Sequence, residues 1–238
     1  MAGSKTRSGV CLACGQVIAK LGIRLHLESC TKRQEKWTLR PTGRGKVRST
    51  SLVLLYIEGR YNPEYWIRIE IPSDARLRDL DQFLRDFWLE CCGHLSRFYE
   101  EIATPPSKRK HPEDVPMSVT IAEAFAPERP VYYTYDFGSS TELILTATDI
   151  RKAQVRDNRA RVLARNLPPE IPCHVCGKPA TWVVPEMAHQ PDAWVCDAHA
   201  KKLSRDLEFL LPVTNSPRVG VCAYTGPLPY IGPRRWIE

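Results

Sequence analysis

The sequence predicts an α+β fold, in which a mostly antiparallel sheet packs against one amphipathic helix and is flanked by a small zinc-binding module at each end. Three observations predict it. Alternating and helical hydrophobic periods occupy the middle of the chain. Pairs of cysteines in zinc-ligand spacing stand near both ends. An apolar content of 43% over 238 residues is ordinary for a globular protein and allows a core.

Residues 1–35 are predicted to form a zinc finger, because they contain the spacing Cys-x2-Cys-x11-His-x3-Cys. The candidate ligands are Cys11, Cys14, His26 and Cys30. A tight turn would hold the first two, and a helix would present the last two on one side, since residues four apart share a helix face. Ile18 and Ile23 stand where such fingers keep their apolar core.

This finger is not expected to read a DNA sequence. In DNA-reading fingers, helix positions −1, 3 and 6 contact bases. Here those positions hold Ala19, Gly22 and Leu25, none of which can form bidentate hydrogen bonds with a base edge. Leu21 and Leu25 would instead form an apolar strip away from the zinc, and such a strip is typical of a protein-binding surface.

The positive charge of the chain is concentrated near its N-terminus. Residues 1–50 contain eleven Lys or Arg and two acidic residues, a net charge of +9, whereas the remaining 188 residues total −2. Residues 36–50 are predicted to be a basic linker. A segment of this charge can attract nucleic acid, and a solvated basic tail is the alternative. The candidate nucleic-acid-binding residues are Lys20, Arg24, Lys32, Arg33, Arg44, Lys46 and Arg48.

Residues 51–167 are predicted to form the main body, which starts with strands over residues 52–58 and 65–71. The second strand alternates between one face (Tyr65, Ile67, Ile69, Ile71) and another (Trp66, Arg68, Glu70). Ser73 or Asp74 is expected to cap the helix that follows. That helix has apolar residues at three- and four-residue steps, namely Leu77, Leu80, Phe83, Leu84, Phe87 and Trp88.

Two hairpins complete the predicted body. Residues 131–138 and 141–148 are expected to pair around Gly138, and a further hairpin is expected over residues 150–166. Strands that follow one another in this way are typical of an α+β fold with an antiparallel sheet.

Residues 168–238 are predicted to contain a zinc ribbon followed by a tail. The candidate ligands are Cys173, Cys176, Cys196 and His199, and His189 or His174 is an alternative fourth ligand. A glycine follows the first pair, which lets the backbone turn and point amides at the thiolates. Short strands are expected over residues 181–184 and 193–195. A site closed by four protein ligands indicates structural zinc.

Five residues outside these modules can carry chemistry: Cys91, Cys92, His94, Asp136 and Cys222. A Cys–His pair can form a nucleophile and its base, and the three cysteines with the histidine can form a third metal site or a redox-sensitive cluster. The plain alternatives are buried cysteines and an aspartate that forms a turn. The sequence lacks a phosphate-binding glycine loop, a nucleophile elbow and paired metal-binding carboxylates, which argues against the commonest enzyme classes.

Several segments make the chain recognisable: Tyr-Trp-Ile-Arg-Ile-Glu-Ile-Pro at 65–72, Trp-Leu-Glu-Cys-Cys-Gly-His-Leu at 88–95 and Tyr-x-Tyr-Asp-Phe-Gly at 133–138. The first and third resemble the plasmid open-reading-frame-three-like family, and the second, with Asn-Ser-Pro-Arg-x-Gly-Val-Cys-x-Tyr-Thr-Gly at 215–226, carries a closer resemblance. The closer resemblance is to a subfamily with an N-terminal finger and a C-terminal zinc ribbon. Members occur on Ri-type plasmids, and some are passenger proteins of insertion elements. The resemblance implies this architecture and no particular activity. The family usually has an acidic residue or Gly and then a Trp after Asp-Phe-Gly, where this chain has Ser139, Ser140 and Thr141.

The sequence therefore predicts a non-enzymatic zinc protein with two structural ions, which acts as an interaction module and contacts nucleic acid non-specifically through its basic N-terminal arm. The alternatives are a protein-binding adaptor without nucleic-acid affinity, and a mobile-element enzyme that uses Cys91, His94 or Asp136. A cytoplasmic protein without membrane contact is expected, because neither an apolar run of membrane-spanning length nor a secretory signal occurs. Cytoplasmic thiols stay reduced, so nine cysteines favour metal binding over disulfides. The oligomeric state stays open.

Overall fold

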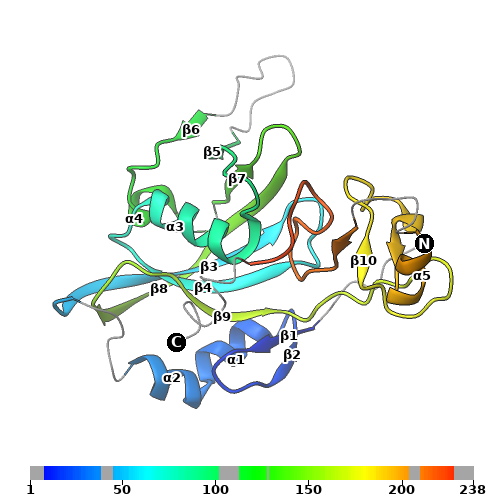
Figure 1. Ribbon diagram of the computed structural model, residues 1–238. Coiled ribbons are helices and arrows are strands. Elements are labelled where there is room, and N and C mark those ends of the chain that lie inside the picture. Colours follow the sequence, from blue (N-terminus) through cyan, green and yellow to red (C-terminus); the bar gives the residue numbers. More distant parts are fainter. Residues whose placement is uncertain (1–7, 39–44, 102–112, 128, 204–209, 228–238) are drawn as a thin grey trace.

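The computed structural model describes residues 8–38, 45–101, 113–127, 129–203 and 210–227, which form an α+β fold with a large antiparallel sheet (Figure 1). The strands are β1 (Ser8–Cys11), β2 (Val17–Ala19), β3 (Arg48–Gly59), β4 (Trp66–Pro72), β5 (Ser96–Glu100), β6 (Glu113–Val115), β7 (Val131–Tyr135), β8 (Thr141–Val155), β9 (Arg161–Asn166), β10 (Trp182–Val183), β11 (Trp194–Val195) and β12 (Leu211–Pro212). The helices are α1 (Ile23–Ser29), α2 (Thr31–Thr38), α3 (Leu77–Leu84), α4 (Ile121–Ala124) and α5 (Asp197–Leu203), with a π-helical turn η1 (Arg85–Leu89) and a 3-10 turn η3 (Pro191–Ala193). Across these ranges, no helix combines the length and apolar character that crossing a membrane requires.

Nine strands form the main sheet in the order β2-β1-β9-β4-β3-β8-β7-β5-β6, and every neighbouring pair is antiparallel. The predicted strands over 52–58 and 65–71 are confirmed as β3 and β4, which pair along their length. The predicted hairpin around Gly138 is confirmed as β7 and β8. The centre of the sheet therefore consists of two hairpins, β3–β4 and β7–β8, which are joined by the pairing of β3 with β8.

The predicted hairpin over residues 150–166 is wrong. The end of β8 pairs with the start of β3, where Val155 lies opposite Arg48, whereas β9 crosses to the far edge of β4. In that position β9 lies between β4 and β1, and most of its residues are buried. A strand with apolar residues on both faces is stable in such a place because both of its faces can be covered.

The amphipathic helix is confirmed as α3, which η1 continues as a π-helical turn. Its apolar residues are buried in the main core together with Ile67, Ile69 and Ile71 of β4. Capping by Ser73 or Asp74 is wrong, because the helix begins later, at Leu77. The carboxylate of Asp79 accepts the backbone N–H of Arg76 at 2.8 Å, and the carboxylate of Asp74 is bound by a guanidinium from β3.

A second core lies on the opposite face of the sheet. There Ile23 and Leu27 of α1 pack with Trp66 of β4, and all three side chains are fully buried. Figure 1 shows α3 and α4 over one face and α1 over the other. The alternation predicted for β4 is therefore real, but its second face is covered rather than solvated. Glu70 on that face is 1% exposed and lies 3.2 Å from Arg33 and 2.8 Å from Arg151.

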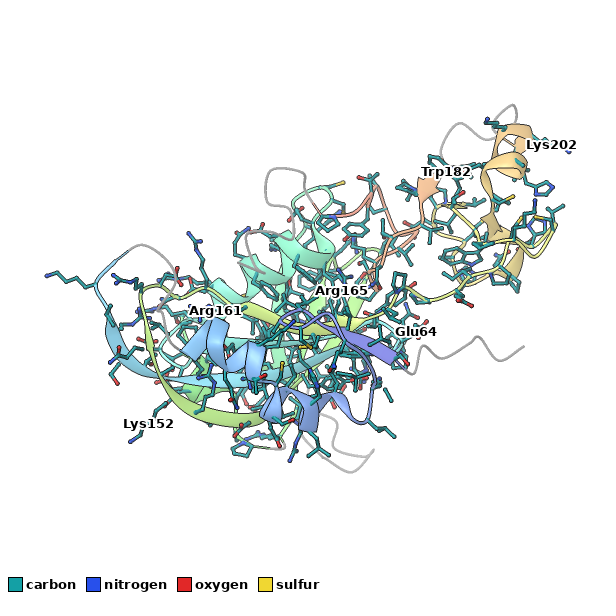
Figure 2. The ribbon with its side chains drawn as sticks, turned by 90° about the horizontal axis from the view of Figure 1, so that it is seen from below. Glu64, Lys152, Arg161, Arg165, Trp182 and Lys202 are labelled. Carbon is teal, nitrogen blue, oxygen red and sulfur yellow. The ribbon has the colours of Figure 1, made fainter. Side chains whose placement is uncertain are left out.

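The C-terminal module has a sheet of its own, in the order β11-β10-β12. The predicted strands over 181–184 and 193–195 are confirmed as β10 and β11, which pair with each other. Figure 2 shows Trp182 and Lys202 of this module at a distance from Arg161 and Arg165 of β9. Its inner side chains join the main core by packing, including Val183, Ala193, Trp194 and Leu211.

Candidate metal centres

The first cluster lies at the junction of the finger and the sheet. Cys11 ends β1, Cys14 follows in a turn, His26 lies on α1, and Cys30 directly follows α1. All four ligand atoms lie within 4.8 Å of one another. The Sγ atoms of Cys11 and Cys30 are 4.0 Å apart, and Cys14 Sγ lies 3.3 Å from His26 Nε2. The structure thus brings together the four ligands that the spacing predicts.

The second cluster lies in the C-terminal module. Cys173, Cys176, Cys196 and His199 place their ligand atoms within 4.8 Å of one another. His199 Nδ1 lies 3.5 Å from Cys173 Sγ and 3.3 Å from Cys196 Sγ, and the Sγ atoms of Cys176 and Cys196 are 3.7 Å apart. His174 and His189 are exposed and lie outside the cluster. The structure therefore favours His199 among the three candidate fourth ligands.

These distances can be compared with those of a tetrahedral zinc site. Bonds of about 2.3 Å to sulfur and about 2.0 Å to nitrogen place two sulfur atoms about 3.8 Å apart and sulfur and nitrogen about 3.5 Å apart. The measured separations in both clusters, from 3.3 to 4.0 Å, lie close to these values. A disulfide would require about 2.05 Å. Both ligand sets therefore fit a four-coordinate zinc ion, with three thiolates and one imidazole each.

The same turn builds both clusters. Gly15 donates its N–H to the carbonyl of Cys11 at 2.8 Å, and Gly177 donates to the carbonyl of Cys173 at 2.8 Å. Both glycines have a left-handed backbone, with φ of 76° and 70°, which residues with a side chain rarely adopt. The sequence carries this signal twice, as Cys-x2-Cys-Gly at residues 11–15 and 173–177.

The thiols within each cluster differ in their surroundings. Burial raises the pKa of the Cys11 thiol to about 11. Burial also acts to raise the pKa of Cys173, but hydrogen bonds from the backbone N–H groups of Cys196, Cys176 and Val175 outweigh it and lower the pKa to about 6. Each cluster also contains a thiol whose pKa is shifted the other way. Burial acts to raise the pKa of Cys14, but hydrogen bonds lower it. A backbone hydrogen bond acts to lower the pKa of Cys176, but burial and the neighbouring thiols raise it.

A third group of side chains meets beside η1. Cys91, Cys92, His94 and Cys222 also place their ligand atoms within 4.8 Å of one another. Cys222 Sγ lies 3.7 Å from Cys92 Sγ and 3.5 Å from His94 Nε2. Asp136 lies at its edge, with its Oδ2 atom 3.5 Å from His94 Nε2. The sequence identified all five residues as candidates and left their arrangement open.

Arg218 is a site residue that the sequence analysis missed. Its side chain is fully buried, and its Nη2 atom lies 2.8 Å from Asp136 Oδ2 and 3.3 Å from Cys91 Sγ. The guanidinium also stands over the ring of Tyr135 at 4.8 Å. Burial acts to raise the pKa of Asp136, but the hydrogen bond from Arg218 is the largest effect that lowers it, and the pKa falls below its usual value. No local pattern marks an arginine that contacts residues 82 and 127 positions away.

The candidate nucleic-acid-binding residues are not brought together on one free surface. Four of them have carboxylate partners: Lys20 with Glu58 at 3.0 Å, Arg24 with Glu28 at 3.2 Å, Arg33 with Glu70 at 3.2 Å and Arg48 with Asp74 at 2.8 Å. Lys32 and Lys46 are exposed, and neither has a carboxylate partner among the described residues. Arg44 lies outside the described residues. Four of the candidate cations therefore form ion pairs within the protein.

Apolar side chains are exposed on the outer side of the finger. Leu21 is 96% exposed, Leu25 is 67% exposed, and Val17 of β2 is 60% exposed. Leu21 lies in the turn before α1, and Leu25 lies in the first turn of the helix. Both residues of the predicted apolar strip are therefore exposed.

A groove of about 440 Å³ lies between the C-terminal module and the main sheet. Its lining includes Glu64, Ser140, His189 and Val221, and it does not include Cys91, His94 or Asp136. This groove therefore gives no route for a substrate to the residues that a catalytic role would need.

Comparisons with known proteins leave the chain without a family. No family model matches it, and neither does any curated protein. Among solved structures, a crystal structure of a protein of unknown function from Methanosarcina mazei Go1 aligns with a TM-score of 0.39 and 18% identity. The alignment covers 48% of this chain and 67% of that one. A likeness this distant carries no argument about function.

Proposed function

We propose that this protein is a non-enzymatic interaction module in which two structural zinc ions hold the finger and the ribbon. The observation that carries the proposal is the closure of each terminal cluster by three cysteines and one histidine at near-tetrahedral separations. A set of four protein ligands has no open position for water or substrate, which is typical of structural zinc. The ions would supply folding free energy and no reaction step.

The module contacts nucleic acid through its phosphates and without base readout. The support is the net charge of +9 over residues 1–50, together with exposed Lys32 and Lys46. Arg24 pairs with Glu28 but is 55% exposed at its side chain, so it adds a third cation. Lys20, Arg33 and Arg48 serve the fold in this proposal, because carboxylates hold them. A small number of phosphate contacts gives weak binding that falls steeply with salt.

A protein partner is the second candidate, because Val17, Leu21 and Leu25 are exposed together on the finger. In this reading the partner has apolar anchors and acidic side chains, which complement the basic segment. Such apolar side chains do not contribute to salt-dependent DNA binding, so the two candidates can be separated by substitution.

The test is a titration of fluorescent double-stranded DNA with the zinc-loaded protein at two salt concentrations. Binding is expected to weaken with salt, and Lys32→Gln with Lys46→Gln should reduce the slope of log K against log salt by about 2. Leu21→Ser with Leu25→Ser is the matched control and should leave the slope unchanged. If the wild-type protein does not bind DNA at the lower salt concentration, or binds equally at both, the nucleic-acid proposal is wrong and the protein partner is favoured.

The zinc content is tested separately by elemental analysis per chain. Cys14→Ser should lose the finger ion and Cys176→Ser the ribbon ion, with His174→Ala as a control that keeps both. Loss of neither ion would show that the terminal clusters are not zinc sites. Membership of the plasmid open-reading-frame-three-like family belongs to the same proposal, and its link to insertion elements accords with a protein that works near DNA.

A further inference from the structure

Every cysteine of this chain belongs to one of three Cys/His clusters. The sequence contains nine cysteines, and each lies in one of three clusters that combine three cysteines with one histidine. Two of these clusters form the terminal zinc modules. We propose that the third, formed by Cys91, Cys92, His94 and Cys222, binds a third thiophilic divalent ion, zinc in the reduced protein, which clasps the C-terminal segment to the main body.

The geometry of the third cluster matches that of the other two. The distance of 3.7 Å between the Sγ atoms of Cys92 and Cys222 equals the distance between Cys176 and Cys196 in the ribbon. The distance of 3.5 Å from Cys222 Sγ to His94 Nε2 lies near the tetrahedral value of about 3.5 Å. The sulfur–sulfur distance is not that of a disulfide, whose sulfur atoms are about 2.05 Å apart.

The backbone takes uncommon conformations to bring these ligands together. Gly93 has φ of 76°, which reverses the chain between Cys92 and His94. Cys222 has φ of 53°, a left-handed conformation that is uncommon for a residue with a side chain. Its N–H donates to Glu186 Oε1 at 2.6 Å, so the ribbon holds this residue in place. Strained residues of this kind concentrate at ligand sites.

The charge around the cluster also suits a bound metal. Three thiolates with a divalent ion carry one net negative charge, which is costly to bury without a counter-charge. Arg218 places a positive charge against the cluster, with its Nη2 atom 3.3 Å from Cys91 Sγ, and shares that charge with Asp136. Arg218 is itself fixed by Asp136 and by the hydroxyl of Thr141 at 3.0 Å. Groups around the ligands that orient them and balance their charge are typical of metal sites.

The ion would join parts of the chain that are far apart in sequence. Cys92 and Cys222 are separated by 130 positions. The segment that carries Cys222 also contacts η1 and β9, where Ser216 Oγ donates to the carbonyl of Trp88 at 2.6 Å and Arg165 donates to the carbonyl of Asn215 at 2.7 Å. None of the four ligands of the third cluster is buried, whereas each terminal cluster has two buried thiols, so the third ion is expected to exchange faster than the other two.

The first test is the mass of the reduced, full-length protein under native conditions, together with its zinc content. Three zinc ions per chain are expected for the wild type and two for Cys222→Ser, while His189→Ala keeps three. Two ions in the wild type, or no change in Cys222→Ser, would overturn the proposal. A mass lower by two hydrogens at this cluster would show a disulfide and would overturn it as well.

A second measurement does not depend on how the variant folds. In the native wild-type protein, all nine thiols should resist a thiol reagent until a chelator is added. Three thiols that react at once while two zinc ions remain would overturn the third site and leave the two-zinc proposal intact. Failure of the terminal modules would appear instead in Cys14→Ser and Cys176→Ser, so the two proposals fail in different ways.

Discussion

In the finger, β1 continues the nine-stranded sheet, whereas the ribbon has a three-stranded sheet of its own. Both modules use three cysteines and one histidine, and both begin with the same Cys-x2-Cys-Gly turn. They differ in what else supports them. The finger shares a core with the sheet around Trp66, while the core around the ribbon cluster consists of Cys173, Val195, Cys196 and Ala200.

The difference teaches that one ligand set can have two structural roles. In each module two of the three thiol ligands belong to the core around the cluster. That core has eight buried residues in the finger and four in the ribbon, whose strands β10 and β11 also pack into the main core. In the finger, backbone pairing of β1 with β9 ties the module to the main sheet, a contact that involves no metal ligand side chain. The ribbon is therefore expected to depend on zinc more strongly than the finger.

The largest expected effect comes from removing one ligand in each module. In Cys176→Ser, amide protection should be lost around the ligands, over residues 173–178 and 196–203, because structural zinc contributes about 10–16 kcal/mol in comparable peptides. In Cys14→Ser, the N–H of Leu12 should stay protected by its bond of 2.9 Å to the carbonyl of Leu163. Hydrogen exchange with mass spectrometry distinguishes the two, and equal loss in both modules would contradict the comparison.

The next effect tests the shared core beneath the finger. Trp66→Ala removes a fully buried side chain between α1 and β4 and should destabilise the protein by about 3–5 kcal/mol. Trp182→Ala in the ribbon is the matched change. It should cost less, because Trp182 is only partly buried and its indole N–H bonds an exposed carboxylate, that of Asp197, at 2.7 Å. Denaturation by urea measures both, and a larger cost at Trp182 would reverse the predicted order.

A smaller effect tests how closely β1 approaches the sheet. A Cβ atom at Gly9 would lie 2.3 Å from Trp66 and 2.5 Å from the carbonyl of Arg165, so Gly9→Ala should cost about 1–3 kcal/mol. Gly22→Ala is the control, since its Cβ would meet no atom closer than 3.5 Å and its φ is −87°. The free energy of unfolding should be lowered in the first variant and not in the second. Equal stability of both would mean that β1 does not pack as described.

The smallest effect concerns charge at the start of β3. A hydrogen bond from Arg48 lowers the pKa of Asp74, and burial acts weakly against it. The pair therefore stabilises the fold above the unfolded pKa of about 3.9 and ceases to do so as the pH falls through the lower folded pKa. Because Asp74 is 46% exposed at its side chain, Arg48→Gln should cost only about 0.2–1 kcal/mol at pH 7.

Two measurements check this pair. The pKa of the Asp74 carboxyl group should rise in Arg48→Gln, as followed by nuclear magnetic resonance. The stability difference between the variant and the wild type should shrink in high salt, because exposed charges are screened. An unchanged pKa would show that Arg48 does not act on Asp74 in solution.

Local signals in the sequence were sufficient for much of this structure. The ligands of both terminal clusters, the β7–β8 hairpin and the apolar face of α3 follow from spacing and period within about thirty residues. The start of α3 was misplaced. Asp79 accepts the backbone N–H of the N-cap Arg76, as the third helical residue does in a capping box, whereas Asp74 is held by Arg48 of β3. The pairing of β9 was also missed, because a hairpin rule counts only sequence neighbours.

By itself, the sequence determined the α+β class and the two ligand sets whose members lie close together along the chain. Only the tertiary structure decided that β1 joins the main sheet, that α1 covers the second face of β4, and that Cys222 meets Cys92 from 130 positions away. The physical reason is the sequence separation of the contacts. A turn or helix fixes neighbours through local hydrogen bonds, whereas distant partners meet only after the sheet has formed and buried the surfaces that bring them together.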